Sequence, residues 1–219
     1  MIRGAVFDVD GTLINSMPAW ETVGSDYVKA HGLIPAEDLD KRVKECCLRD
    51  VSLIMQNEYG IEKSLDDIET ELSKMVEYKY FNTIPLKPGV EKLLQGMEER
   101  GIKMCLASAS RYEHIERALS RCGVMHYFSK IFSCIDVGSS KREPEIYRLA
   151  MEHLGTSPEE TCMFDDALYV AQMAASLDIK PIGIYDEYMF HQEELKAATD
   201  YYIEDYNELD GFWNYFDKL

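Results

Sequence analysis

Hydrophobic positions along this chain follow two kinds of pattern, which occupy different stretches. An apolar run at residues 3–7 predicts a strand, and from about residue 85 onward short apolar runs alternate with amphipathic stretches. The later strands that this pattern predicts are 103–107, 130–134, 161–164, 180–184 and 200–203. Helices are expected between them, beginning near Gly89, Arg111, Glu145 and Leu168. This alternation predicts an α/β fold, a doubly wound parallel sheet with helices on both faces.

Residues 16–84 carry only helical patterns. Ser16 is a suitable N-cap for a first helix, which has Pro18 in its first turn and ends at Gly32. Further helices are predicted over 37–47, 49–59 and 65–80, the last of them capped by Ser64. We therefore expect two domains: an α/β core made of residues 1–15 plus 85–219, and an all-helical domain of residues 16–84 inserted after the first strand.

The chain is acidic, with a formal net charge of −17 over 219 residues. That charge opposes binding to nucleic acid or to an anionic membrane, and no apolar run is long enough to span a bilayer. None of the cysteines forms a CxxC pair and no secretory signal is recognisable, so a disulfide framework is not expected. The cysteines are Cys46, Cys47, Cys105, Cys122, Cys134 and Cys162. We expect a cytoplasmic monomer or weak homodimer with no nucleic-acid or membrane partner.

Residues capable of chemistry follow the predicted strands. Asp8 and Asp10 come directly after the first strand, Ser108 follows the second, and Asp165 and Asp166 follow the strand at 161–164. Ligands of a doubly wound sheet bind at the carboxyl ends of the strands, so these side chains are expected at one edge. Asp8 and Asp10 can face one site, because residues i and i+2 of an extended segment point the same way.

This set suits phosphoryl transfer. One carboxylate can attack phosphorus while its neighbour protonates the leaving oxygen, and Asp8 and Asp10 are the candidates for these roles. A dianionic phosphate repels an anionic nucleophile, so the site needs positive charge. Asp8, Asp166 and a backbone carbonyl near Asp10 form an oxygen-only set that suits Mg²⁺, and Lys141 adds a second positive charge. Asp165 and Asp166 could instead cap the following helix, but adjacent buried carboxylates are costly without a cation.

Other candidate groups also have ordinary structural interpretations. Ser108 and Ser110 could both cap the helix that begins near Arg111; Ser110 is the better cap, and the Ser108 hydroxyl is the better phosphate donor. Taken alone, Lys141 would be a surface lysine in a polar loop. Gly11 allows close approach of the backbone to a ligand, and its amide can point at an anion.

The order and spacing of these residues resemble those of the haloacid dehalogenase superfamily, over nearly the whole chain. The resemblance rests on the DVDGTL segment at residues 8–13, the strand that ends in Ser108, Lys141 with Pro144 three residues later, and the acidic pair after Phe164. The helical insert is similar to the small cap of the subgroup that contains β-phosphoglucomutase and many sugar-phosphate phosphatases. This sequence departs from the family pattern at Arg142, where a proline is usual.

The resemblance implies a fold and a set of roles. It implies a Rossmann-like core, an aspartyl-phosphate on Asp8, acid/base work by Asp10, and Lys141 as the third catalytic residue. The metal ligands that it implies are Asp8, the Asp10 carbonyl and Asp166, with Asp165 assisting next to them. The phosphate-binding positions that it implies are Gly11, Thr12, Ser108 and Ala109. In the cap, Arg49 and Lys74 are similar to residues of mutase-type relatives that contact the substrate.

Three functions follow from these residues. The first is hydrolysis of a small phosphorylated metabolite, most simply a sugar phosphate, with Mg²⁺ as cofactor. The second is a sugar phosphomutase, which Arg49 and Lys74 favour and Trp20 opposes, because mutase-type relatives often carry a histidine there. The third, from a different class, is a signalling module phosphorylated on aspartate; the acid/base Asp10 and the long insert argue against it.

Overall fold

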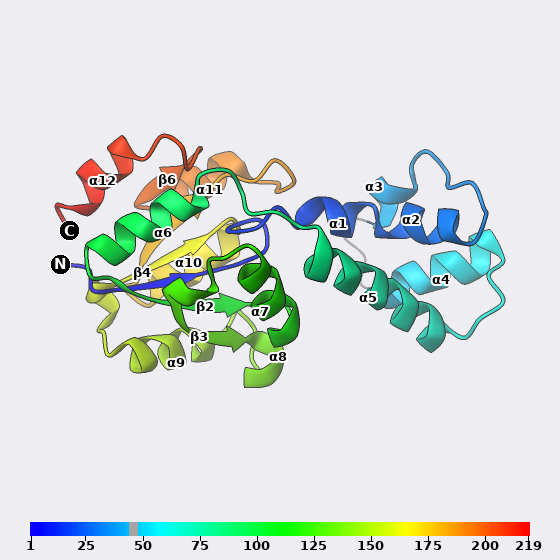
Figure 1. Ribbon diagram of the computed structural model, residues 1–219, viewed down its shortest axis with the longest axis horizontal. Coiled ribbons are helices and arrows are strands. Elements are labelled where there is room, and N and C mark those ends of the chain that lie inside the picture. The colour runs from blue at the N-terminus through cyan, green and yellow to red at the C-terminus, as the bar shows by residue number, and fades with distance from the viewer. Residues whose placement is uncertain (44–47) are drawn as a thin grey trace. The chain divides into compact units, whose positions relative to one another are not determined.

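A computed structural model describes residues 1–43 and 48–219 of the chain (Figure 1). The end of the helix predicted at 37–47 and two cysteines, Cys46 and Cys47, lie outside the described residues. The chain divides into two compact units, one made of Met1–Asn15 with Pro85–Leu219 and the other of Ser16–Ile84.

The first unit contains a sheet of six strands in the order β3-β2-β1-β4-β5-β6. All neighbouring strands pair in parallel, which confirms the predicted α/β fold class. The strands are β1 (Gly4–Phe7), β2 (Lys103–Ser108), β3 (Phe128–Ser133), β4 (Thr161–Asp165), β5 (Lys180–Ile184) and β6 (Tyr201–Ile203). The helices are α6 (Val90–Glu99), α7 (Tyr112–Arg121), α8 (Cys134–Val137), α9 (Glu145–Leu154), α10 (Leu168–Ser176), α11 (Gln192–Ala198) and α12 (Asp210–Phe216).

The sheet has hydrophobic packing on both faces because successive strand residues point in opposite directions. On one face Val6 of β1 packs in a buried cluster with side chains of α9 and α10. On the other face Phe7 stacks on Phe164 at 4.2 Å between ring centroids, and Phe164 meets Phe212 of α12 edge-on at 5.9 Å. Helical cover on both faces is what the near-continuous apolar strands predict.

The pairing register brings the strand ends together. Phe7 at the end of β1 pairs with Leu106 of β2 and with Phe164 of β4. The Asp8 amide continues the ladder by donating to the Phe164 carbonyl oxygen at 2.9 Å. The residues just beyond β1, β2 and β4 therefore lie at one edge of the sheet.

One predicted strand is displaced along the chain. The apolar run at 130–134 forms part of β3, but the strand begins at Phe128 and ends at Ser133. Cys134 instead begins the short helix α8, which ends at Val137. Its C-cap is Gly138, whose backbone is in the left-handed conformation. The described cysteines Cys105, Cys122, Cys134 and Cys162 are free thiols.

The second unit is helical throughout its described residues. Its helices are α1 (Met17–Glu21), α2 (Val23–Ala30), α3 (Leu39–Val43), α4 (Leu48–Tyr59) and α5 (Leu65–Asn82). Ser64 caps α5 as predicted, by accepting a hydrogen bond from the Asp67 amide at 3.1 Å. Ser16 is at the N-cap of α1 but makes no side-chain cap, and the single helix predicted for 16–32 is interrupted at Thr22.

The two chain segments at the boundary of the units pair with each other within the first unit. Ile14 and Leu86 form an antiparallel bridge, and the Lys87 amide donates to the Leu13 carbonyl oxygen at 2.9 Å. The loop after β1 is thereby tied to the segment that returns from the helical unit.

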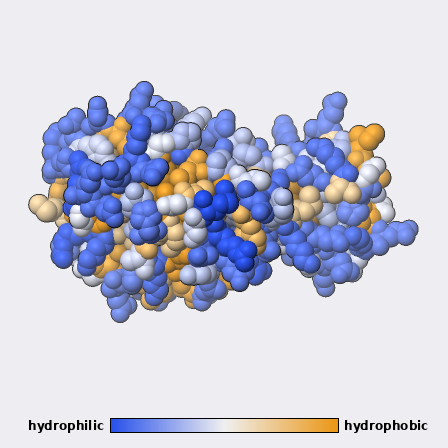
Figure 2. Space-filling model, viewed as in Figure 1, coloured by the Kyte–Doolittle hydropathy of each residue, from blue (hydrophilic) through white to orange (hydrophobic). Residues whose placement is uncertain are grey.

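The visible surface is largely hydrophilic (Figure 2), as expected for a net charge of −17. Within the described residues, none of the helices combines the length and apolar character needed to cross a membrane.

Candidate active site

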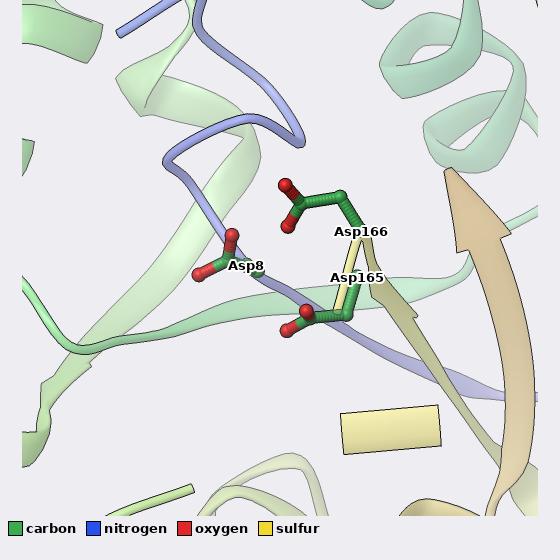
Figure 3. A group of neighbouring side chains, drawn as sticks. All are labelled: Asp8, Asp165 and Asp166. Carbon is green, nitrogen blue, oxygen red and sulfur yellow. The ribbon is translucent and has the colours of Figure 1, made fainter. Parts of the chain in front are cut away.

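Three aspartates meet where β1 and β4 end. Asp8 follows β1, Asp165 is the last residue of β4, and Asp166 follows it; all three are buried. One carboxylate oxygen from each lies within 4.8 Å of the others. Figure 3 shows the Asp165 and Asp166 side chains extending from the end of β4 toward the side on which the Asp8 carboxyl group lies. Residues more than 150 positions apart in the sequence thus form one acidic cluster.

Lys141 supplies the positive charge within this cluster. Its ammonium donates to Asp8 Oδ1 and, at 2.9 Å, to Asp165 Oδ2. The hydroxyl of Tyr147 on α9 donates to the Lys141 carbonyl oxygen at 2.7 Å, which fixes the lysine backbone. The Arg142 guanidinium lies over the Tyr169 ring at 4.0 Å, a cation–π contact that ties the same loop to α10. Lys141 is therefore a buried, anchored residue rather than a surface lysine.

Burial and like charges shift the titration of these groups. Desolvation, supported by the nearby Asp165 and Asp10 and opposed by Lys141, raises the pKa of Asp8 to about 7. Desolvation also raises the pKa of Asp166 well above its usual value, and Asp165 and Asp8 add to that rise. Burial alone would lower the pKa of Lys141, but the carboxylates of Asp165 and Asp8 outweigh it and raise the pKa. Lys141 stays charged, and the acids around it favour any added cation.

The two acidic residues of β4 have different surroundings. Asp165 is held by two donors, with Lys141 at one oxygen and the Ala167 amide at the other at 2.9 Å. Asp166 accepts a hydrogen bond from the Thr12 hydroxyl at 3.4 Å. Asp8 and Asp166 are therefore better placed than Asp165 to bind a metal directly, and Asp165 orients Lys141.

Gly11 allows the loop after β1 to pass close to Asp166. Its φ of 77° is in the left-handed region, and a Cβ at this position would lie 2.2 Å from Asp166 Oδ2. The expectation that the Gly11 amide points at an anion is wrong for this structure, because that amide donates to the Ile14 carbonyl oxygen at 3.1 Å. The glycine is needed for space and for its backbone conformation.

Asp10 faces the end of β2 and meets two serines there. The Ser110 hydroxyl donates to Asp10 Oδ2 at 2.6 Å, and the Ser108 hydroxyl lies 3.5 Å from the same oxygen. The sequence makes Ser110 the better candidate cap for the next helix, but the N-cap of α7 is Arg111 and no side-chain cap is formed. The Ser110 hydroxyl instead binds the Asp10 carboxylate. The Ser110 amide donates to Ser108 Oγ at 3.0 Å.

The structure adds two residues that the sequence pattern did not indicate. The Lys87 ammonium donates to the Gly11 carbonyl oxygen at 2.6 Å, to the Tyr185 carbonyl oxygen at 2.5 Å and to Asp186 Oδ2 at 3.0 Å. The Asp186 side chain is only 2% exposed, and Asp186 adds to the charges that raise the pKa of Asp166. A lysine before Pro-Gly and an aspartate in a loop carry no local signal, since their proximity arises only from the fold.

The donor set fits a divalent cation. Buried carboxylates come from Asp8, Asp165, Asp166 and Asp186, whereas the ammonium groups among them come from Lys141 and Lys87. The four carboxylates and two lysines leave a formal excess of two negative charges, which one divalent ion would neutralise. Oxygen ligands without nitrogen or sulfur are those that Mg²⁺ prefers, so the residues present fit this ion.

The roles of the other predicted positions, Ala109, Arg49 and Lys74, stay predictions. Ala109 is exposed directly after β2. In the helical unit Lys74 is exposed on α5, and Arg49 pairs with Asp66 and, at 3.6 Å, with Glu69. A substrate contact by Arg49 would have to displace these carboxylates.

Comparison with known proteins identifies the family. A family model described as haloacid dehalogenase-like hydrolase matches residues 2–178. The chain belongs to this family. This membership confirms the resemblance seen in the sequence and the prediction of a hydrolase.

Several proteins similar to this chain are named phosphatases. The chain is 25% identical over 181 residues to the phosphorylated carbohydrates phosphatase of Thermotoga maritima, covering 83% of this chain and 84% of that protein. It is 28% identical over 167 residues to hexitol phosphatase A of Escherichia coli, covering 75% and 74%. A crystal structure of a candidate beta-phosphoglucomutase from Thermotoga maritima, 22% identical, superposes over 100% of both chains with a TM-score of 0.86, which shows that the fold is shared.

Proposed function

We propose that this hydrolase is a Mg²⁺-dependent phosphatase that cleaves a small phosphorylated carbohydrate through an aspartyl-phosphate on Asp8. The observation that carries the proposal is the buried cluster of Asp8, Asp165 and Asp166 with the Lys141 ammonium inside it. A nucleophilic carboxylate and a phosphate can approach each other only where fixed positive charge offsets their repulsion. Lys141 supplies part of that charge.

The reaction has two displacement steps. An Asp8 oxygen attacks phosphorus, the bond from phosphorus to the substrate oxygen breaks, and Asp10 gives that oxygen its proton. Asp10 then takes a proton from water, the water oxygen attacks phosphorus, and inorganic phosphate leaves with Asp8 restored. Mg²⁺, held by Asp8, Asp166 and the Asp10 carbonyl, would supply positive charge to the phosphate oxygens.

The surrounding residues orient these groups. Lys141 keeps Asp8 in place and favours its ionised form, and Asp165 orients Lys141. Ser110 holds the Asp10 carboxyl group at 2.6 Å, at a fixed place beside the reacting oxygen. Ser108, Thr12 and the amide of Ala109 complete the phosphate environment in this proposal.

Support for the substrate class comes from the relatives. Two of them are named for phosphorylated carbohydrates and for hexitol phosphates, and phosphate esters of this kind are small and polar. In the proposal the helical unit Ser16–Ile84 is a cap that excludes bulk water during the reaction, with Arg49 and Lys74 as its substrate contacts. We further propose a cytoplasmic monomer or weak homodimer that binds no nucleic acid.

A phosphate-release screen tests the proposal. The panel contains hexitol phosphates, aldose phosphates and nucleotides, each with Mg²⁺ and with a chelator. Asp8→Asn is expected to abolish release, Asp10→Asn to lower it strongly, and the surface change Asp205→Asn to leave it unchanged. Release that persists in Asp8→Asn would refute the assigned roles.

The same panel separates hydrolysis from phosphoryl return to the sugar. A mutase would isomerise a sugar monophosphate when primed with a bisphosphate and would release little phosphate. Trp20 stands where mutase-type relatives often carry a histidine. Its indole N–H donates to the Tyr80 hydroxyl at 3.1 Å, a contact within the helical unit. We therefore expect phosphate release to dominate.

A further inference from the structure

Lys87 makes an unusual set of contacts for a residue of a connecting segment. Its ammonium has three N–H donors, and three acceptors surround it: the carbonyl oxygens of Gly11 and Tyr185 and the Asp186 carboxylate. The three acceptors belong to two loops: Gly11 is in the loop after β1, and Tyr185 and Asp186 are both in the loop after β5. The Lys87 side chain is 15% exposed, and burying a charge to this degree is costly unless it is paired.

The contact with Gly11 bears directly on the acidic cluster. Gly11 follows Asp10, and its own amide is already held by the Ile14 carbonyl oxygen at 3.1 Å. With Lys87 on its carbonyl oxygen, Gly11 is held at both of its backbone polar groups. The peptide between Asp10 and Gly11, which carries the Asp10 carbonyl, can then turn very little.

Asp186, the third partner of Lys87, is itself held in place. One of its oxygens binds Lys87 and the other accepts the Tyr188 amide at 2.9 Å, so the carboxylate cannot rotate freely. A Cβ on Gly11 would lie 3.4 Å from Asp186 Oδ2 and 2.2 Å from Asp166 Oδ2, which places Gly11 between the two carboxylates. Lys87 and Asp186 are therefore next to the part of the loop after β1 that passes Asp166.

We infer that Lys87 and Asp186 are positioning residues for the Mg²⁺ site, because together they fix the Asp10–Gly11 peptide whose carbonyl is one of the proposed metal ligands. The inference rests on the proposed function and deepens it. Lys87 touches neither the metal nor the substrate; it acts through the backbone of Gly11. Groups that orient metal ligands in this way commonly change metal affinity by about 10- to 100-fold when removed.

The test separates position from charge. Lys87→Met alone removes a positive charge near the site, so a purely electrostatic role predicts tighter Mg²⁺ binding. Lys87→Met combined with Asp186→Asn leaves the net charge of the protein unchanged and removes the hydrogen bond from residue 87 to the Gly11 carbonyl oxygen. We expect this double variant to bind Mg²⁺ alone, measured by titration calorimetry, about 10- to 100-fold more weakly than the parent protein. Lys103→Met is the matched control, because the Lys103 ammonium also donates to a carbonyl oxygen, that of Leu154, at the other end of β2.

A merely structural role would give a different result. It would lower the melting temperature without metal and leave the Mg²⁺ dissociation constant of the folded protein unchanged, and that outcome would overturn the inference. If the double variant does not fold, Lys87→Gln with Asp186→Asn replaces it, since an amide offers two N–H donors where the ammonium offers three. Loss of Mg²⁺ binding together with full activity of Asp8→Asn would instead refute the proposed function.

Discussion

The Lys141 ammonium lies against the Asp8 carboxylate, 133 positions earlier in the chain, and both side chains are about 95% buried. The pair forms because β1 lies at the centre of the sheet and the loop before α9 reaches its carboxyl edge. A buried ion pair of this kind does little for stability by itself, since desolvation offsets much of the attraction. Its position beside Asp166 is consistent with the role proposed for Lys141 in the reaction.

Lys141→Met should abolish phosphate release and lower the free energy of unfolding. Without the ammonium, Asp8 and Asp165 are left as unpaired buried acids, and breaking a buried pair costs about 3–5 kcal/mol. Urea unfolding and phosphate release measure the two losses. Lys180→Met is the control, because Lys180 pairs with Asp200 at 3.7 Å near the surface, where a pair contributes about 0–1 kcal/mol. Equal losses in the two variants would contradict the assignment.

Stability without metal should fall as the pH rises. The pKa of Asp8 is 3.8 in an unfolded chain and about 7 in the folded protein, so between these values the folded state binds a proton that the unfolded state has released. The free energy of unfolding then decreases with pH over this window. Thermal melts in a chelator from pH 5 to 8 should show this decrease, and Asp8→Asn should show a smaller one. Surface acids with lowered pKa values, such as Glu71, are already ionised there.

Added Mg²⁺ should counteract the loss of stability at high pH. A cation competes with protons for the acidic cluster, so the increase in melting temperature on adding Mg²⁺ should be larger at pH 8 than at pH 5. Melts at a fixed Mg²⁺ concentration across the same pH range measure it. An increase independent of pH would place the bound ion away from these carboxylates.

Gly11→Ala should damage the site more than its backbone conformation alone explains. Any residue with a Cβ costs about 1–2 kcal/mol in the left-handed region. At Gly11 the Cβ also meets Asp166 Oδ2 at 2.2 Å, whereas Gly138, with a similar φ of 71°, has nothing within 4 Å of such an atom. We expect Gly138→Ala to lose only the backbone contribution and Gly11→Ala to lose Mg²⁺ binding as well. Equal Mg²⁺ affinities in the two variants would show that Asp166 does not need this space.

Ser110→Ala should affect substrates according to their leaving groups. Ser110 holds the Asp10 carboxyl group that protonates the leaving oxygen, so an alkyl phosphate should lose turnover by about 10-fold or more. A nitrophenyl phosphate, whose leaving group needs no proton, should be much less affected. A uniform loss on both substrates would indicate that Ser110 acts on the phosphate instead.

Much of this site could be predicted from the sequence because its residues follow buried strands. Asp8, Asp165 and Asp166 are at strand ends, where the alternation of apolar runs and helices already defines the edge of the sheet. From the sequence, Ser110 is the better of two candidate helix caps, because a serine near a helix start usually has that role. Its contact with Asp10 depends on the pairing of β1 with β2, which brings the residues beyond Phe7 and beyond Leu106 to one edge of the sheet.

Lys87 and Asp186 could not be predicted in the same way. Lys87 is in a connecting segment and Asp186 is in the loop after β5, 99 positions later. Nothing near either residue in the sequence indicates a buried pair. Their proximity depends on the bridge between Ile14 and Leu86 and on the loop after β5, which are tertiary features.

Phosphorylation of Asp8, on which the proposed function depends, can be detected by trapping the intermediate. Asp10→Asn lacks the base for the second step, so incubation with Mg²⁺ and a nitrophenyl phosphate, followed by acid quench and borohydride reduction, should convert residue 8 into homoserine. Peptide mass spectrometry locates the change. We expect homoserine at residue 8, together with a burst of one equivalent of nitrophenol per protein. A burst with residue 8 unmodified and another residue phosphorylated would show that Asp8 is not the nucleophile.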